Sequence, residues 1–245
     1  MKRIMFFLIC LCLGAPATAG PIDANSKDFV AANLTAIFYH ELGHAFIDIM
    51  KLPIYGQEED AADVLSAVLV HQLFEAENAL QVAYATALGF RSDGYDSDNV
   101  AYWDVHGPDQ QRYYTFVCLF YGADPGKRQA FANDLKLPEG RQQTCPEEYR
   151  QAAGSWGPVM EELVKNGAGR SMRFLADHRT DVFGKLTADV ISNAVKSMNA
   201  DMSLPKPLLV RVEACGVVNA FYNPKSREIT MCIEFARSLA GMAPR

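Results

Sequence analysis

Apolar residues recur at helical spacings along most of the chain, whereas short strand-like runs follow Pro205. Apolar side chains fill residues 27–50, which predicts a buried first helix, and Pro53 and Gly56 end it. We expect a second helix over residues 57–88.

Asp, Ser and Gly crowd residues 91–98, which favours a loop there. Residues 167–179 have no pattern that assigns them to a helix or a strand. Three further helices are expected, over residues 108–121, 146–165 and 181–202.

Strands are expected over residues 208–212, 217–222 and 229–235, the last two as a hairpin that turns at Asn223-Pro224. No repeat or low-complexity tract is visible. The pattern therefore predicts an α+β fold, a mainly helical domain with a small C-terminal sheet.

The first residues have the features of an export signal. Lys2 and Arg3 precede an apolar run over residues 4–13, and Ala17-Thr18-Ala19 supplies a small-residue cleavage site. The run is too short to span a bilayer, and we expect no membrane helix after it. We therefore expect residues 1–19 to be a signal peptide and residues 20–245 to form one domain, periplasmic or secreted.

The charge balance is acidic, with 23 Lys and Arg against 29 Asp and Glu. Removal of the signal peptide makes it more acidic still. An acidic chain without a basic face has nothing to offset phosphate repulsion, so we expect no nucleic-acid partner.

Four cysteines remain after export, and an even number in an oxidising compartment suggests two disulfides. Three pairings are possible. We favour Cys215–Cys232, which flank the expected hairpin turn symmetrically, and Cys118–Cys145, which would join two helices. A four-cysteine zinc site is the alternative, although no CxxC spacing supports it.

The stretch His40-Glu41-Leu42-Gly43-His44 has the spacing of a zinc site with its own general base. Residues four apart share a helix face, so His40 and His44 can bind one cation. Zinc lowers the pKa of a coordinated water to about 7, and Glu41 can accept its proton. Chance produces such a match in about one chain in a hundred of this length. Buried within an apolar helix, however, these polar side chains would be costly without a metal.

A catalytic zinc needs a third protein ligand, and the acidic start of the second helix is the obvious source. Glu59 and Asp63 lie four apart, so Glu59 can bind the metal while Asp63 orients a histidine. The alternative is that these acids only favour the helix dipole, the interpretation that we prefer for Glu58 and Asp60.

HELGH followed by Glu59-x-x-Ala62-Asp63 resembles the gluzincin arrangement, in which a Glu is the third zinc ligand and an Asp supports a histidine. A wider resemblance, over most of the mature chain, is to a bacterial family classed as metallopeptidases. It rests on HELGHA, EEDAAD, H-x-x-D-x-Q-R-x-Y and C…NAFYxP…C. It implies a zincin-like fold.

Only fourteen residues separate His44 from Glu59, fewer than in thermolysin-like gluzincins. The first helix must end soon after His44, or the connection must double back. Otherwise Glu59 would lie about 10 Å from the metal, and His106 or another carboxylate would be the ligand.

Two further segments are candidates for the cleft. His106 could stabilise an oxyanion, although residues 106–112 also fit a helix start with an Asp109/Arg112 pair. Asn219 and Ala220 resemble, in reversed chain order, the segment with which the neprilysin family holds extended substrate on an edge strand. The alternative is a plain disulfide-stapled hairpin.

These features together favour a zinc (Zn²⁺) peptidase that acts on a peptide or protein substrate. His40, His44 and Glu59 would bind zinc, and Glu41 would be the general base. The alternative is a non-catalytic structural or interaction protein that retains the metal site. A third possibility is an inhibitor or surface-interaction module that binds through the cysteine hairpin.

Overall fold

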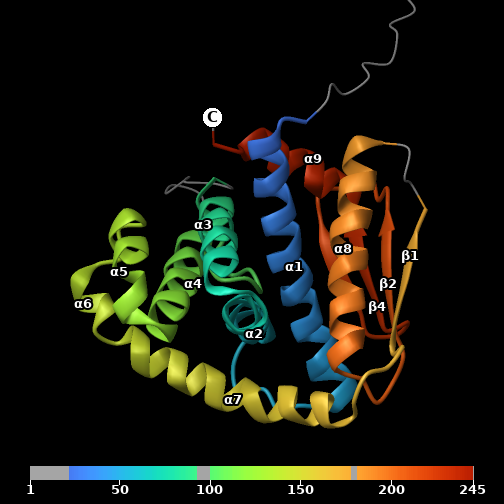
Figure 1. The fold of residues 1–245 in the computed structure, drawn as a ribbon, viewed down its shortest axis with the longest axis horizontal. Coiled ribbons are helices and arrows are strands. Elements are labelled where there is room, and N and C mark those ends of the chain that lie inside the picture. The colour runs from blue at the N-terminus through green and yellow to red at the C-terminus, as the bar shows by residue number, and fades with distance from the viewer. Residues whose placement is uncertain (1–21, 93–99, 178–180, 245) are drawn as a thin grey trace, which may run out of the picture.

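The computed structural model describes residues 22–92, 100–177 and 181–244. Its central element is α1 (Ala24–Met50), which has helices on one side and, on the other, the sheet together with a further long helix (Figure 1). The Asp23 side chain caps α1 by accepting a hydrogen bond from the Ser26 N–H. Because both flanks cover it, α1 is buried around most of its circumference, as its apolar composition predicted.

The predicted helix over residues 57–88 is in fact two helices, α2 (Glu58–Leu73) and α3 (Ala76–Ser92). Phe74 adopts an extended conformation (φ −113°, ψ 145°) and breaks the run. The loop expected over residues 91–98 is wrong at its start, because Arg91 is helical. Ser92 is helical as well, and the rest of the expected loop, residues 93–98, lies outside the described residues.

The helices α4 (Asp109–Ala123), α7 (Cys145–Lys165) and α8 (Val182–Asp201) confirm three predicted helices to within a few residues. Two short helices between them, α5 (Pro125–Asp134) and α6 (Glu139–Gln142), were not predicted. The predicted Cys118–Cys145 disulfide joins α4 to the first turn of α7.

The sheet has four strands in the order β1-β2-β4-β3. They are β1 (Met172–Ala176), β2 (Leu208–Glu213), β3 (Ala220–Asn223) and β4 (Glu228–Cys232). The first three in this order run parallel, and β3 and β4 form the predicted antiparallel hairpin. The α+β fold class is therefore confirmed.

The strand expected over residues 229–235 is too long. It ends at Cys232, and Ile233 begins a further helix, α9 (Ile233–Met242). Its buried residues, Ile233, Ala236 and Leu239, recur every third position, which is the spacing of a helix face. The predicted Cys215–Cys232 disulfide is present, so both pairs are confirmed and a four-cysteine zinc site is excluded.

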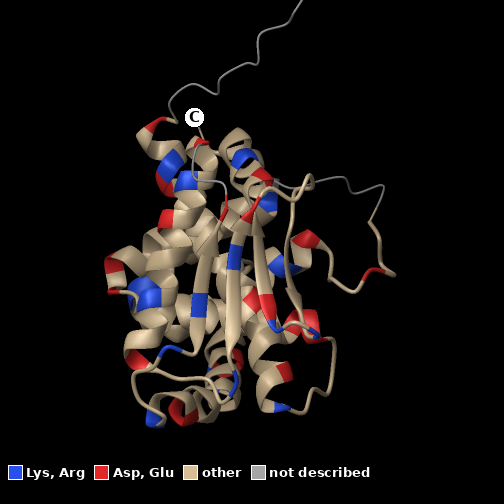
Figure 2. Ribbon diagram, turned by 90° about the vertical axis from the view of Figure 1, so that its right-hand side faces the viewer, with Lys and Arg blue, Asp and Glu red and all other residues tan. Residues whose placement is uncertain are grey.

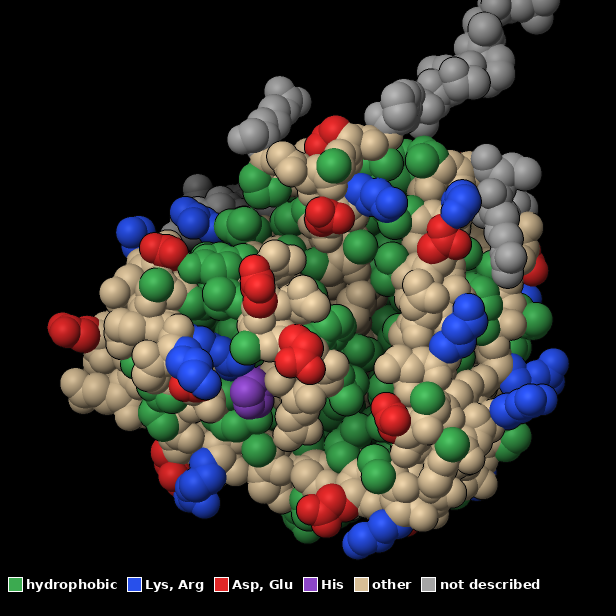
Figure 3. Space-filling view, viewed as in Figure 1, with side chains coloured by type: hydrophobic (Ala, Val, Ile, Leu, Met, Phe, Trp, Pro, Cys, Tyr) green, Lys and Arg blue, Asp and Glu red, His purple; other side chains and the backbone are tan. Residues whose placement is uncertain are grey.

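The positions of Lys and Arg and those of Asp and Glu are interspersed along the ribbon in Figure 2. On the face of Figure 3, hydrophobic side chains gather in a central hollow, where a groove runs between α1, α3 and α8. Within the described residues, no helix is long and apolar enough to cross a membrane.

Candidate active site

The helices α1 and α2 cross closely, which brings the histidine motif of α1 and the acidic motif of α2 together. After α1 ends at Met50, Lys51 takes a left-handed conformation (φ 56°, ψ 45°), and the chain turns back into α2. Gly43 then lies against Ala62, so near that a Cβ added at Gly43 would be 2.8 Å from the Ala62 Cα. Only small residues permit this approach. Glu59 and Asp63, on either side of Ala62, thereby reach the histidines of α1.

His40, His44 and Glu59 converge on one point. The two Nε2 atoms are 3.2 Å apart, and Glu59 Oε2 is 3.1 Å from that of His40 and 3.2 Å from that of His44. Tetrahedral zinc with ligand bonds of about 2.0–2.1 Å requires donors about 3.3 Å apart. The donor atoms therefore have the spacing and the chemistry that zinc needs, and the short connection does not hold Glu59 away from the rings.

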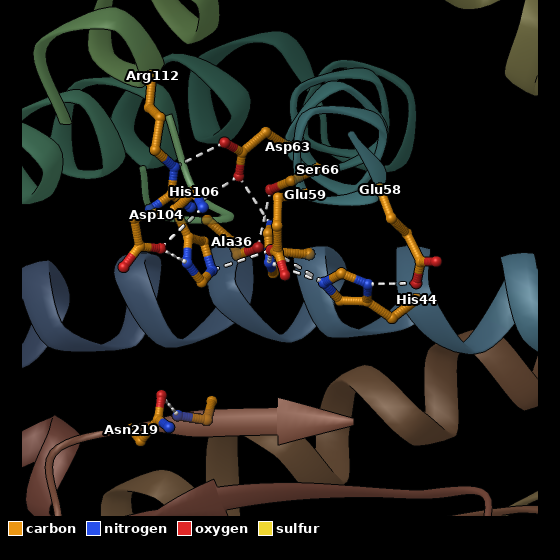
Figure 4. A network of polar contacts seen from close by, with 12 residues as sticks. Ala36, His44, Glu58, Glu59, Asp63, Ser66, Asp104, His106, Arg112 and Asn219 are labelled. Carbon is orange, nitrogen blue, oxygen red and sulfur yellow. Dashed lines mark hydrogen bonds and ion pairs between the residues drawn. The ribbon is translucent and has the colours of Figure 1, made fainter. Parts of the chain in front are cut away.

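Carboxylates orient both rings from behind (Figure 4). Asp63 Oδ1 is 2.8 Å from Nδ1 of His40, and Glu58 Oε1 is 2.8 Å from Nδ1 of His44. A carboxylate accepts the Nδ1 hydrogen, so in the neutral ring the Nε2 lone pair is left for a cation. The contact of Glu58 corrects the sequence interpretation, which gave this residue only a helix-dipole role.

Arg112 fixes Asp63 in turn. Its Nε donates to Asp63 Oδ2 at 2.7 Å and its Nη2 to Oδ1 at 2.9 Å, a bidentate pair. The Asp109/Arg112 pair that the sequence suggested is present as well, at 3.9 Å between Arg112 Nη1 and Asp109 Oδ1. Arg112 thus has a structural role, as the sequence interpretation favoured, with Asp63 as its partner.

His106 contacts the carboxylate of Glu59, which is also the one that His40 and His44 contact. Its Nε2 is 3.0 Å from Glu59 Oε2, and its Nδ1 is 3.2 Å from Asp104 Oδ1. The ligand atoms of His40, Glu59 and His106 all lie within 4.8 Å of one another. His106 is therefore placed either to contact a substrate or to supply a fourth donor. No pattern in the sequence pointed to Asp104.

Burial and charge set the protonation of these groups. Burial raises the pKa of Glu41, which is 6% exposed. Burial lowers the pKa of His40, but the carboxylates of Asp63 and Glu59 outweigh it and raise that pKa to about 9. Burial raises the pKa of Asp63, but hydrogen bonds from Arg112 and His40 lower it to about 2. A buried carboxyl with a raised pKa suits a general base.

A cleft of about 590 Å³ separates this cluster from the edge of the sheet. It is lined by the motif residues of α1, by Glu59 and His106, and by Asn219 and Ala220. In Figure 4, α1 runs between α2 and the strand segment that carries Asn219. The structure thus brings all the predicted metal, catalytic and substrate-binding residues to one cleft.

The strand that borders the cleft is the outermost one of the sheet, β3. Cys232 N–H donates to the Asn219 carbonyl at 3.2 Å, so Asn219 directs its main chain toward β4. The alternation of an antiparallel pair then turns the main-chain groups of Ala220 and Tyr222 outward. Ala220 N–H is held by Asn219 Oδ1 at 2.9 Å. The Ala220 carbonyl and the main-chain groups of Tyr222 on this edge can therefore pair with an extended peptide.

The fold and the site define a mainly helical α+β protein with a histidine–carboxylate cluster suited to a metal ion. A family described as "Putative metallopeptidase" (DUF4344) matches residues 17–160 and 179–243. The chain belongs to this family, whose description assigns it to the peptidases that use a metal ion. No curated protein and no solved structure matches the chain.

Proposed function

We propose that this protein is an exported zinc peptidase of the gluzincin type, with His40, His44 and Glu59 as the zinc ligands. The observation that carries the proposal is the mutual spacing of 3.1 to 3.2 Å among their three donor atoms. Two imidazoles and one carboxylate form the ligand set of a catalytic zinc that keeps a position for water. Support for export comes from the two disulfides, which form in oxidising compartments.

Zinc bound there would acidify water and polarise a peptide carbonyl. Glu41 follows the first ligand in the chain and lines the cleft, and burial keeps its carboxyl poorly hydrated. In our proposal it accepts the proton of the attacking water and returns it to the leaving amine. His106 stabilises the oxyanion, and Asn219 and Ala220 hold the extended substrate at the strand edge.

The test replaces the proposed base without changing its shape. Glu41→Gln should retain zinc at one equivalent per chain while hydrolysis of a peptide mixture falls by about 10²–10⁴-fold. Metal content and cleavage are measured on the same preparations of wild type and variant. Hydrolysis undiminished in the variant would remove Glu41 from the mechanism.

One observation favours a second function, a metal-dependent structural or interaction protein without turnover. His106 Nε2, 3.0 Å from Glu59 Oε2, could be a fourth protein ligand, and structural zinc is usually closed by four. Cobalt-substituted protein separates the two. An open position responds to added azide with a change in the visible spectrum, whereas a closed site does not. His106→Ala should retain cobalt if the site is catalytic and weaken its binding strongly if the site is structural.

A further inference from the structure

A second cavity, of about 160 Å³, lies behind the proposed general base. Its lining shares with the cleft the residues His40, Glu41, His106, Asn219 and Ala220. It therefore adjoins the space in which the scissile bond would lie, with these residues between the two. A group that entered the cavity would extend from an atom close to that bond.

Apolar groups from four helices form most of the wall of this cavity. The contributors are Ala36, Ile37, Phe90, Phe116, Phe235 and Leu239. Ile37 is one turn before Glu41 on α1, and Phe235 is in the first turn of α9. The wall therefore favours a hydrocarbon surface over a charged or strongly polar one.

The uncharged polar residues deep in the wall, Asn33, Ser66 and Thr86, donate their side-chain hydrogens within the protein. Asn33 donates both amide hydrogens to main-chain carbonyls, at 2.9 and 3.1 Å. Ser66 and Thr86 each donate to a main-chain carbonyl at 2.8 Å. Arg112 and Asp63 neutralise each other in their bidentate pair. An anionic ligand, which would also face the carboxyls of Glu41 and Asp109, would thus lose its hydration with little compensation.

We propose that this cavity receives the side chain of the substrate residue next to the scissile bond and selects a medium-sized apolar one. A cavity of about 150 Å³ in another protein binds benzene, so about 160 Å³ accommodates the ring of Phe or the branched chain of Leu. The proposal rests on the proposed peptidase function. It makes Ile37 and Phe235 determinants of specificity.

Two substitutions change the cavity in opposite directions. Ile37→Phe fills it beside Glu41, and Phe235→Ala enlarges it from the α9 side. Both positions are only partly buried, which limits the cost to folding. Phe174→Ala is the matched control, because Phe174 is also partly buried but lies on β1 and does not line the cavity.

Cleavage sites are sequenced after digestion of a mixed peptide library by the zinc-loaded proteins. Wild type and Phe174→Ala should favour Phe, Leu or Met over Gly at one position next to the cut, by at least about tenfold. Phe235→Ala should gain cleavage beside Trp, and Ile37→Phe should shift the preference to Ala or Gly. Cleavage without preference, or with a preference that neither variant moves, overturns the proposal and leaves the peptidase function standing.

A binding experiment keeps the cavity testable if no peptide is cut. Toluene is titrated into wild type, Ile37→Phe and Phe174→Ala while methyl resonances are followed by NMR. The cavity assignment predicts saturable shifts at Ile37 and Leu239 in wild type. It also predicts that the Leu239 shifts are retained in Phe174→Ala and lost in Ile37→Phe. This result supports the cavity assignment even though the peptidase function has failed. The absence of shifts in wild type overturns it.

Discussion

Gly43 offers the sharpest test of how the fold builds the site. In an exposed helix interior, Gly→Ala stabilises a protein by about 1 kcal/mol through helix propensity. At Gly43 the new Cβ would be 2.8 Å from the Ala62 Cα and 3.0 Å from its Cβ. Those atoms belong to the facing helix, so no flexible side chain can move aside. Overpacking of this kind costs about 1–3 kcal/mol, which cancels or exceeds the propensity gain.

The larger effect should be on the metal. To restore ordinary contact, which begins at 3.4 Å, α2 must retreat by at least about 0.6 Å. Glu59, one turn before Ala62, moves with it, whereas metal–ligand distances tolerate about 0.2 Å. We therefore expect Gly43→Ala to weaken zinc binding by at least about tenfold, which corresponds to about 1.4 kcal/mol.

The matched control is Gly154→Ala in α7. Gly154 is helical and exposed, and an added Cβ would meet nothing within 4 Å. This variant should be more stable by up to about 1 kcal/mol and should bind zinc as the wild type does. Urea unfolding and chelator competition are measured on all three proteins. The reasoning is refuted if Gly43→Ala gains stability as Gly154→Ala does and keeps wild-type zinc affinity.

Three more predictions follow from contacts around the site. Asp63→Asn, which keeps its shape but loses the charge that orients His40, should weaken zinc binding by about 10–100-fold in a chelator titration, and unchanged affinity would contradict the orienting role. Arg112→Met leaves the buried Asp63 with His40 as its remaining partner and should lower the free energy of unfolding by about 1.5–3 kcal/mol, measured in urea, whereas an unchanged free energy of unfolding would show that the Arg112 pair is not needed. Replacement of both Cys215 and Cys232 by Ser should lower the free energy of unfolding by about 3 kcal/mol. Because the disulfide anchors the strand that borders the cleft, the same replacement should raise KM more than it weakens metal binding. An unchanged KM would argue against substrate contact there.

The sequence predicted local patterns well where one element satisfies them alone. The apolar run of α1, the hairpin and the two disulfide pairs each depend on residues close in sequence or on a small number of options. The His40/His44 spacing is likewise a property of a single helix.

The errors arose where tertiary contacts decide the conformation. The residues near Phe74 contain no signal that predicts a helix break. The apolar run after Cys232 fits a strand or a helix until its packing is known. The sequence also could not decide whether Glu59 reaches the histidines, because that depends on the Gly43–Ala62 contact between two helices. The positions of Glu58 and Asp104 behind the histidine rings follow from the same crossing and from an irregular loop.

The most direct test of the account is anomalous diffraction at the zinc edge from crystals of zinc-loaded protein. One ion should lie between the helices α1 and α2, about 2.0–2.2 Å from Nε2 of His40, Nε2 of His44 and a carboxylate oxygen of Glu59. Zinc bound elsewhere, or bound at the two histidines without Glu59, would contradict the proposal that these three residues form the metal site.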